Sequence, residues 1–144
     1  MKKTIFVITG VFLLVMLILV LALIGVQSKN KALSDINSEY EFYLNKEIYG
    51  TELAALVNKA IDNNQKEEIE RDKNGYYINN GQTSIQISIQ MIGAKEKIQI
   101  ERVFALGTEQ FVELFNSGIF ISENVTYHKQ TGRIATIDFK QIQE

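Results

Sequence analysis

The sequence predicts an α+β protein, in which an N-terminal transmembrane helix continues into an amphipathic helix and a small antiparallel sheet with short helices follows. Residues 5–26 form an uncharged apolar run. Apolar residues then recur every three or four positions, which is the period of an α-helix. From residue 67 onward the period falls to two. Strands and helices cluster without a repeated β-α-β order, which favours an antiparallel sheet.

Composition limits the domain count and the partners. The residues after the apolar run suffice for one compact domain. The formal charge is −2, and beyond Lys2 and Lys3 the chain has 15 − 2 = 13 basic against 17 acidic residues, or −4. Nucleic-acid binding, which needs clustered Lys and Arg, is therefore not expected. The absence of cysteine excludes disulfides and thiolate metal sites.

The apolar run at residues 5–26 has the length of a membrane span. As a helix it extends about 33 Å, against roughly 30 Å of bilayer hydrocarbon. Secretory signal peptides have shorter apolar regions, although Val26 and Ser28 provide a passable cleavage pair. We therefore expect an uncleaved anchor in the lipid bilayer, and a cleaved leader is the alternative.

Orientation depends on the flanking segments. Lysines lie on both sides of the run, so the positive-inside bias is nearly balanced. A short tail at residues 1–4 and a whole domain after the helix favour a cytoplasmic N-terminus. The expected location is the cell membrane, with a single pass and the C-terminal domain outside the cytoplasm.

A pilin-type start is another interpretation of the same residues. The segment "KKTIFVITG" followed by "VFLLVM" resembles the basic leader and apolar helix of type IV pilins. Pilins usually carry a glutamate at the fifth mature position, where this chain has Val15. The resemblance therefore extends only to the plan of an apolar helix followed by a small α+β head.

An apolar stripe follows the anchor at residues 27–48, which we interpret as an amphipathic helical stalk ending near Lys46. Two interpretations of the stripe remain open. Packing against the protein's own domain is favoured because apolar stripes usually bury in their own core. The alternative is an interface with a partner helix, since tyrosine is common at interfaces. The candidate interface residues are Leu33, Ile36, Tyr40, Tyr43 and Leu44.

Residues 49–144 are predicted to form the extracytoplasmic α+β domain, which begins with a second helix. Gly50 separates this helix from the stalk, and Thr51 is a suitable N-cap. An apolar face recurs through Ile61, and the Asn63-Asn64 pair predicts the C-terminal end.

The next part of the domain is predicted to contain strands. Residues 67–79 are typical of a hairpin that turns at Asn74-Gly75. Residues 83–92 alternate, with Ile85, Ile87, Ile89 and Met91 on a buried face and Ser and Gln on the other. We interpret this polar face as solvated or, alternatively, as a recognition surface. Residues 95–103 predict another strand.

The C-terminal part is predicted to contain a short helix and a hairpin. Thr108 is expected to cap a helix through Phe115. The last two strands are expected to turn at residues 130–132. Their core-facing residues are predicted to be Val125, Tyr127, Ala135, Ile137 and Phe139.

Two segments, "YGTELAALVNKAIDNN" and "YHKQTGRIATIDF", are similar to a family of short single-pass envelope proteins of Gram-positive bacteria. The resemblance covers most of the domain. It implies an anchored envelope protein and transfers no activity and no site residues.

Catalytic chemistry is not expected. His128 is the only histidine, which excludes a two-histidine metal site, and its position beside a turn predicts solvent exposure. Ser84, Ser88 and Ser122 lack a nucleophile-elbow pattern. We therefore predict no catalytic, cofactor-binding or metal-binding residues and a protein that is not an enzyme.

Three functions follow in order of preference. The first is a non-enzymatic structural or assembly subunit of a bacterial envelope complex, secretion or pilus-like, with protein partners. The second is an anchored extracytoplasmic binding or sensing module whose ligand occupies a cavity on the polar sheet face. That cavity is expected to be lined by aromatics such as Tyr76, Tyr77 and Phe120. An enzyme is third.

Overall fold

The computed structural model describes the backbone of residues 2–143, and side-chain burial for all of these except residues 2–7, 108 and 114. The chain divides into two units, residues 1–35 and residues 36–144. Each unit is described by itself.

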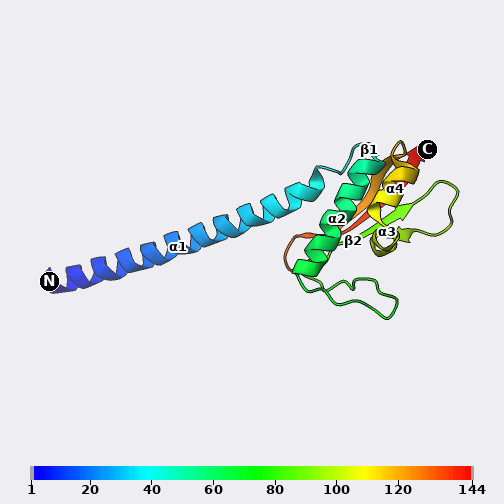
Figure 1. Ribbon diagram of the computed structural model, residues 1–144. Helices are drawn as coiled ribbons and strands as arrows, with labels where there is room; N and C mark the ends of the chain where they lie inside the picture. The colour runs from blue at the N-terminus through cyan, green and yellow to red at the C-terminus, as the bar shows by residue number, and fades with distance from the viewer. Residues whose placement is uncertain (1, 144) are drawn as a thin grey trace. The chain divides into compact units, whose positions relative to one another are not determined.

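The first unit consists of the N-terminal part of helix α1 (Lys2–Glu41), drawn in blue to cyan in Figure 1. Within the described residues, α1 is the helix that is long and apolar enough to cross a membrane. Its residues from Ile8 to Val26 are exposed. A helix that is apolar around its whole circumference is typical of a membrane span.

Helix α1 ends at Glu41 instead of continuing to Lys46 as predicted. The backbone N–H groups of Tyr43 and Leu44 bond carbonyls only three residues back, at 2.9 and 3.0 Å. Asn45 then adopts a left-handed conformation with φ of 55°. Asparagine tolerates this conformation better than most residues. A left-handed residue cannot continue a right-handed helix, so the helical turn ends here.

The second unit begins before the domain boundary that we predicted at residue 49. Asn37, Tyr40, Leu44 and Ile48 are all buried within it. The end of α1 and the turn after it therefore belong to the compact domain.

A five-stranded sheet forms the centre of the second unit, in the order β1-β4-β5-β2-β3. The strands are β1 (Ile48–Tyr49), β2 (Gln86–Gln90), β3 (Ile98–Gln99), β4 (Ile119–Tyr127) and β5 (Ile134–Gln143). The α+β class is confirmed.

The sheet is mixed, and the antiparallel prediction is wrong for one pair. β2 and β5 are parallel, with Ile87 beside Ile137 and Ile89 beside Phe139, while the other strand pairs are antiparallel. β3, two helices and β4 lie between β2 and β5 in the chain. That length permits the crossover that parallel neighbours require.

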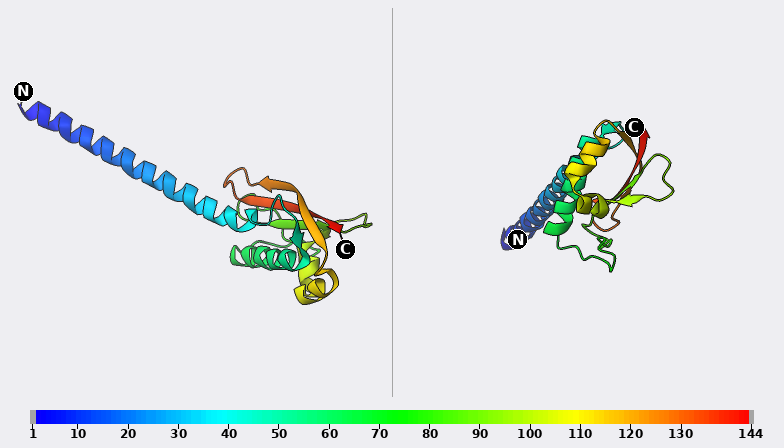
Figure 2. Two further views of the ribbon diagram at one scale, coloured as in Figure 1. Left: turned by 90° about the horizontal axis from the view of Figure 1, so that it is seen from above. Right: turned by 45° about the vertical axis from the view of Figure 1, so that its right-hand side comes forward.

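Helices α2 (Gly50–Lys66), α3 (Ile100–Leu106) and α4 (Thr108–Phe115) cover one face of the sheet (Figures 1 and 2). The apolar residues of β2 and β5 meet these helices, and Leu53, Leu56 and Phe139 are fully buried between the layers. Because strand side chains alternate, the polar residues of β2 and β5 lie on the opposite face, which no helix covers.

The ends of helix α2 differ from the predicted ones. Its N-cap is Tyr49 and not Thr51, and the Tyr49 backbone N–H donates to the Glu52 carboxylate at 2.9 Å. A side chain at Gly50 would place its Cβ 1.9 Å from the carbonyl oxygen of Phe115, so only glycine fits there. The helix continues past Asn64 to Lys66.

Other elements match the predictions in part. The predicted hairpin at residues 67–79 has its turn, with φ of 85° at Gly75, but only an isolated bridge between Arg71 and Tyr77. The predicted strand at 95–103 is the short β3 followed by α3. Helix α4 is confirmed, with Gly107 as its N-cap in place of Thr108. The final hairpin is confirmed, although Tyr127 is half exposed.

Candidate functional site

A cleft of about 590 Å³ opens on the helix-free face of the sheet. Its floor is formed by side chains of β2 and β5, and its walls by the segment from Asp72 to Asn79 and by β3 with the first turn of α3. We call this feature the sheet cleft. Its polar floor residues are Gln86, Ser88, Thr136 and Asp138.

Asp138 is the centre of the floor. It accepts hydrogen bonds from the Ser88 hydroxyl at 2.5 Å and the Asn124 amide at 3.2 Å, and it pairs with the Lys97 ammonium at 3.0 Å. Burial by itself raises the pKa of Asp138, but the bonds from Ser88, Lys97 and Asn124 together hold that pKa below its ordinary value. The carboxylate is therefore charged and engaged by its own protein.

Tyr77 forms a fixed wall of the sheet cleft. Its backbone N–H donates to Glu101 at 2.8 Å, and its carbonyl accepts a bond from the Gln86 amide at 2.9 Å. The Arg71 guanidinium lies 4.3 Å from the ring centroid and donates to the Tyr77 hydroxyl at 2.7 Å. With 3% of its surface exposed, Tyr77 acts as structure and not as a contact surface.

Tyr76 is the accessible aromatic of the sheet cleft. It lines the cleft and is only half buried. The Asp72 carboxylate accepts the backbone N–H groups of Asn74 and Tyr76 at 2.8 and 2.9 Å, which closes the turn that carries this ring. The bond from the Tyr76 backbone, with those from Asn74 and Gly75, keeps the pKa of Asp72 below its ordinary value.

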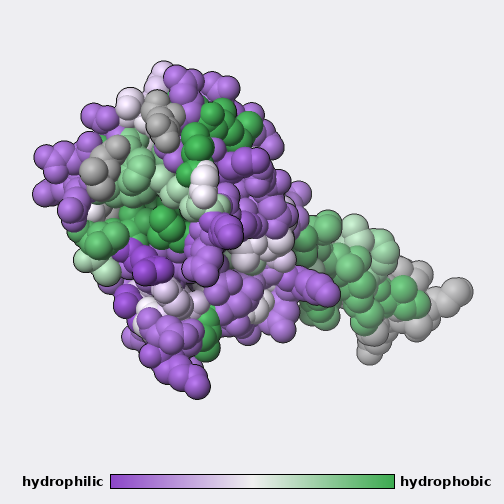
Figure 3. Space-filling model, turned by 90° about the vertical axis from the view of Figure 1, so that its right-hand side faces the viewer, coloured by the Kyte–Doolittle hydropathy of each residue, from purple (hydrophilic) through white to green (hydrophobic). Residues whose placement is uncertain are grey.

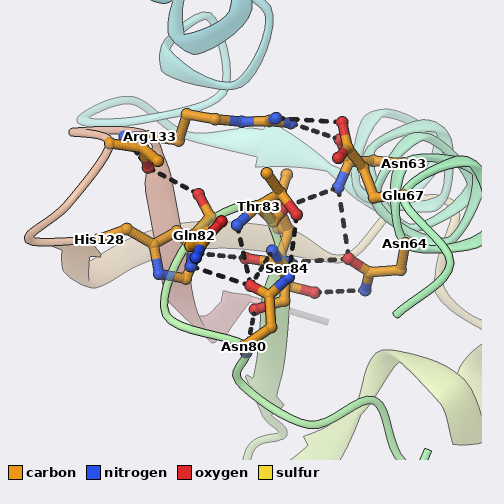
Figure 4. A network of polar contacts seen from close by, with 11 residues as sticks. Asn63, Asn64, Glu67, Asn80, Gln82, Thr83, Ser84, His128 and Arg133 are labelled. Carbon is orange, nitrogen blue, oxygen red and sulfur yellow. Dashed lines mark hydrogen bonds and ion pairs between the residues drawn. The ribbon is translucent and has the colours of Figure 1, made fainter. Parts of the chain in front are cut away.

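A second polar cluster lies where the β4–β5 turn meets the end of α2 and the loop at residues 80–84 (Figure 4). Asn64 is fully buried, and its amide both donates to the Ile85 carbonyl at 2.7 Å and accepts the Ile85 N–H at 2.8 Å. Arg133 binds Glu67 and Asn63 at 3.1 and 2.8 Å. These contacts join chain segments, so we interpret the cluster as structural.

The predicted solvent exposure of His128 is wrong. Only 4% of the residue is exposed, and its Nε2 donates to the carbonyl of Ser84 at 2.8 Å. The β4–β5 turn packs on the loop at residues 80–84, where the Thr131 hydroxyl also donates to the Gln82 carbonyl at 2.6 Å. This packing buries His128. The histidine contacts a backbone carbonyl and not a serine hydroxyl, which gives no nucleophile–base pair here.

The candidate interface residues have different positions. Tyr40 and Leu44 lie in the core of the second unit, as internal packing of the stripe requires. Tyr43 packs against that core and is partly exposed, as are Leu33 and Ile36. An interface role for these three remains a prediction.

The aromatics expected around the sheet cleft are partly correct. Tyr76 and Tyr77 line it, but Phe120 is fully buried in the core on the other face. Lys97, Gln99, Glu101 and Asp138 were missed. The signal for Asp138 was its position between Ile137 and Phe139, which places a carboxylate on the polar face. The contact of Asp138 with Ser88 on β2 depends on the parallel pairing of β2 with β5.

Together these features define an α+β domain with a polar cleft on its open sheet face, preceded by a helix long enough to cross a membrane. Within residues 8–143 no cluster of three or more His, Cys, Asp or Glu side chains suits a metal ion. Comparison with family models, curated proteins and solved structures finds no match. The functional argument therefore rests on the residues of the sheet cleft.

Proposed function

We propose that the protein is a membrane-anchored binding module that holds a ligand in the sheet cleft, outside the cytoplasm. The observation that carries this proposal is the cleft of about 590 Å³, one wall of which combines the braced Tyr77 with the partly exposed Tyr76. Clefts of this size with a few placed polar groups are common ligand sites.

This proposal places the binding module above the assembly subunit that the sequence favoured. Tyr40 and Leu44 of the stripe are buried in the core of the second unit, so fewer stripe residues can contact a partner. Anchoring by residues 5–26 and the resemblance to envelope proteins support the location.

Single-cysteine labelling tests both the location and the occupancy of the cleft. The chain has no cysteine, so one introduced thiol is the only reactive one. Asn79→Cys places the thiol at the edge of the sheet cleft, and Gln65→Cys places it on an exposed position of α2 as the matched control. Intact native cells and the purified full-length protein are treated with a membrane-impermeant maleimide.

The proposal expects the Gln65→Cys protein to react in intact cells. The Asn79→Cys protein should react slowly in cells and normally after purification, because a bound ligand shields the cleft. Equal reactivity of the cleft thiol in both preparations, relative to the control, contradicts the binding function. Labelling of Gln65→Cys only after permeabilisation contradicts the location.

An assembly subunit is the second candidate, and the surface of α3 and α4 favours it. Leu106 is 69% exposed and lines an apolar pocket of about 230 Å³ together with Ile98 and Phe115, and Phe104 in the same helix is 43% exposed. Figure 3 shows apolar surface gathered on this face and bordered by hydrophilic surface. If another membrane-anchored subunit packs there, Leu106→Asp should reduce the native complex to the mass of the single chain without lowering Tm. A native mass already equal to that of one chain contradicts assembly.

A further inference from the structure

We infer that the ligand of the sheet cleft is neutral and rich in hydroxyl groups, which is the chemistry of an uncharged saccharide. This inference rests on the proposed binding function. It follows from the charges that line the cleft, from the hydrogen-bonding groups left unused there, and from the position of the accessible tyrosine.

Charge argues against an anionic ligand. Three carboxylates line the sheet cleft, from Asp72, Glu101 and Asp138, against one ammonium from Lys97. Lys97 is paired with Asp138 at 3.0 Å, which leaves two negative charges without a cation in the lining. A cleft lined by one sign of charge repels ligands of that sign.

The carboxylates are also poorly placed for a cationic ligand. Asp72 directs its oxygens at the N–H groups of its own turn. Asp138 already has three partners. Glu101 has one oxygen bonded to the Tyr77 N–H, so only its second oxygen faces a ligand unused. A carboxylate oxygen that is still free accepts a ligand hydroxyl in a charge-assisted hydrogen bond.

The unused groups are a balanced set of donors and acceptors. Among the described residues, no protein group is bonded to the Tyr76 hydroxyl or to the Gln99 amide. Gln86 uses its NH₂ on the Tyr77 carbonyl, and no group of the described residues is bonded to its oxygen. Amides and hydroxyls that both donate and accept match a ligand whose own groups do both, as sugar hydroxyls do.

Tyr76 and Ile78 complete the match. Both line the sheet cleft, and Ile78 is 39% exposed. An aromatic ring beside polar groups suits a ligand with an apolar C–H face and hydroxyls at its edge. A pyranose ring has this form.

The test uses the full-length protein in lipid nanodiscs, prepared without sugar-based detergents. Binding is measured by NMR saturation transfer and titration with three neutral trisaccharides, namely maltotriose, cellotriose and triacetylchitotriose. Trigalacturonate is the anionic comparison, and the deacetylated chitosan trimer is the cationic one. Tyr76→Ala and Gln99→Ala alter the cleft, and Tyr127→Ala removes a half-exposed tyrosine outside it as the control.

A neutral trisaccharide should bind, and each cleft variant should weaken it about tenfold while Tyr127→Ala does not. Trigalacturonate should bind more weakly than the best neutral sugar. Binding of the chitosan trimer alone overturns the inference in favour of a cationic ligand. Neutral binding that Tyr76→Ala leaves unchanged also overturns it. If no neutral sugar binds while Asn79→Cys is protected in cells, the ligand class is wrong and the binding function stands.

Discussion

Asn37 at the end of α1 accepts the backbone N–H of Ile134 at the start of β5, at 3.1 Å and 97 residues away in the chain. The same amide donates to the Gly132 carbonyl at 3.0 Å. Asn37 thus pairs with the backbone on both sides of Arg133, as a neighbouring strand would do. Asn64 pairs in the same way with Ile85. Two asparagine side chains therefore complete the backbone hydrogen bonding at the start of β5 and just before β2, where these two strands do not yet pair with each other.

Asn37→Ala should destabilise the domain. The change leaves the Ile134 N–H, in a residue only 1% exposed, without its partner, and an unpaired buried group costs about 1–3 kcal/mol. Thermal unfolding of the full-length protein in nanodiscs measures the effect. Ser34→Ala, at an exposed position of the same helix, is the control. A Tm change no larger than that of the control would show that the pairing contributes nothing.

Gly50→Ala should also be destabilising. Its Cβ would meet backbone atoms of Phe115 at 1.9 and 2.7 Å, so α2 and α4 must move apart. Overpacking of this kind costs typically about 1–3 kcal/mol. Gly25→Ala, where nothing lies within 4 Å of the added carbon, is the matched control and should leave chemical unfolding unchanged. Equal unfolding midpoints for the two variants would refute the close approach.

His128→Ala should lower the unfolding free energy by about 1–3 kcal/mol, because it removes the partner of the buried Ser84 carbonyl. Lys129→Ala changes an exposed neighbour and should have little effect. Denaturant titration compares the two. A His128→Ala protein as stable as wild type would contradict the structural role.

Stability should fall in acid through Asp138. The pKa of Asp138 is lowered in the folded protein, so its contribution is present above the unfolded pKa of about 4 and is lost as the pH falls through the folded pKa. The contribution is small, since the side chain is 23% exposed and solvent screens the Lys97 pair.

Asp138→Asn should make the unfolding free energy less dependent on pH below about 4. Glu123→Gln changes the exposed carboxylate paired with Lys140 and serves as the comparison. The measurement is the unfolding free energy of both variants and the wild type from denaturant titrations at a series of acidic pH values. An Asp138→Asn profile as steep as that of wild type would remove Asp138 as a source of the acid sensitivity.

Local patterns predicted most helices and the last hairpin because their signals lie within a few residues. The apolar face of α2 and the alternation in β2 and β5 are such signals. The secondary structure of residues 95–103 could not be predicted from local signals. Ile98 and Gln99 pair with β2, and from Ile100 the chain turns into a helix that buries Ile100 and Val103. Apolar residues at that spacing fit a short strand or a helix turn equally well.

The sequence by itself determined the apolar N-terminal helix, the α+β class, the absence of disulfides and a polar face on β2, since each depends on composition or on the period of side chains along one segment. Tertiary structure alone decided the burial of His128, the parallel pairing of β2 with β5 and the meeting of Ser88, Lys97 and Asp138. These features join residues up to 50 positions apart, and a hydrogen bond over that separation depends on the path of the whole chain.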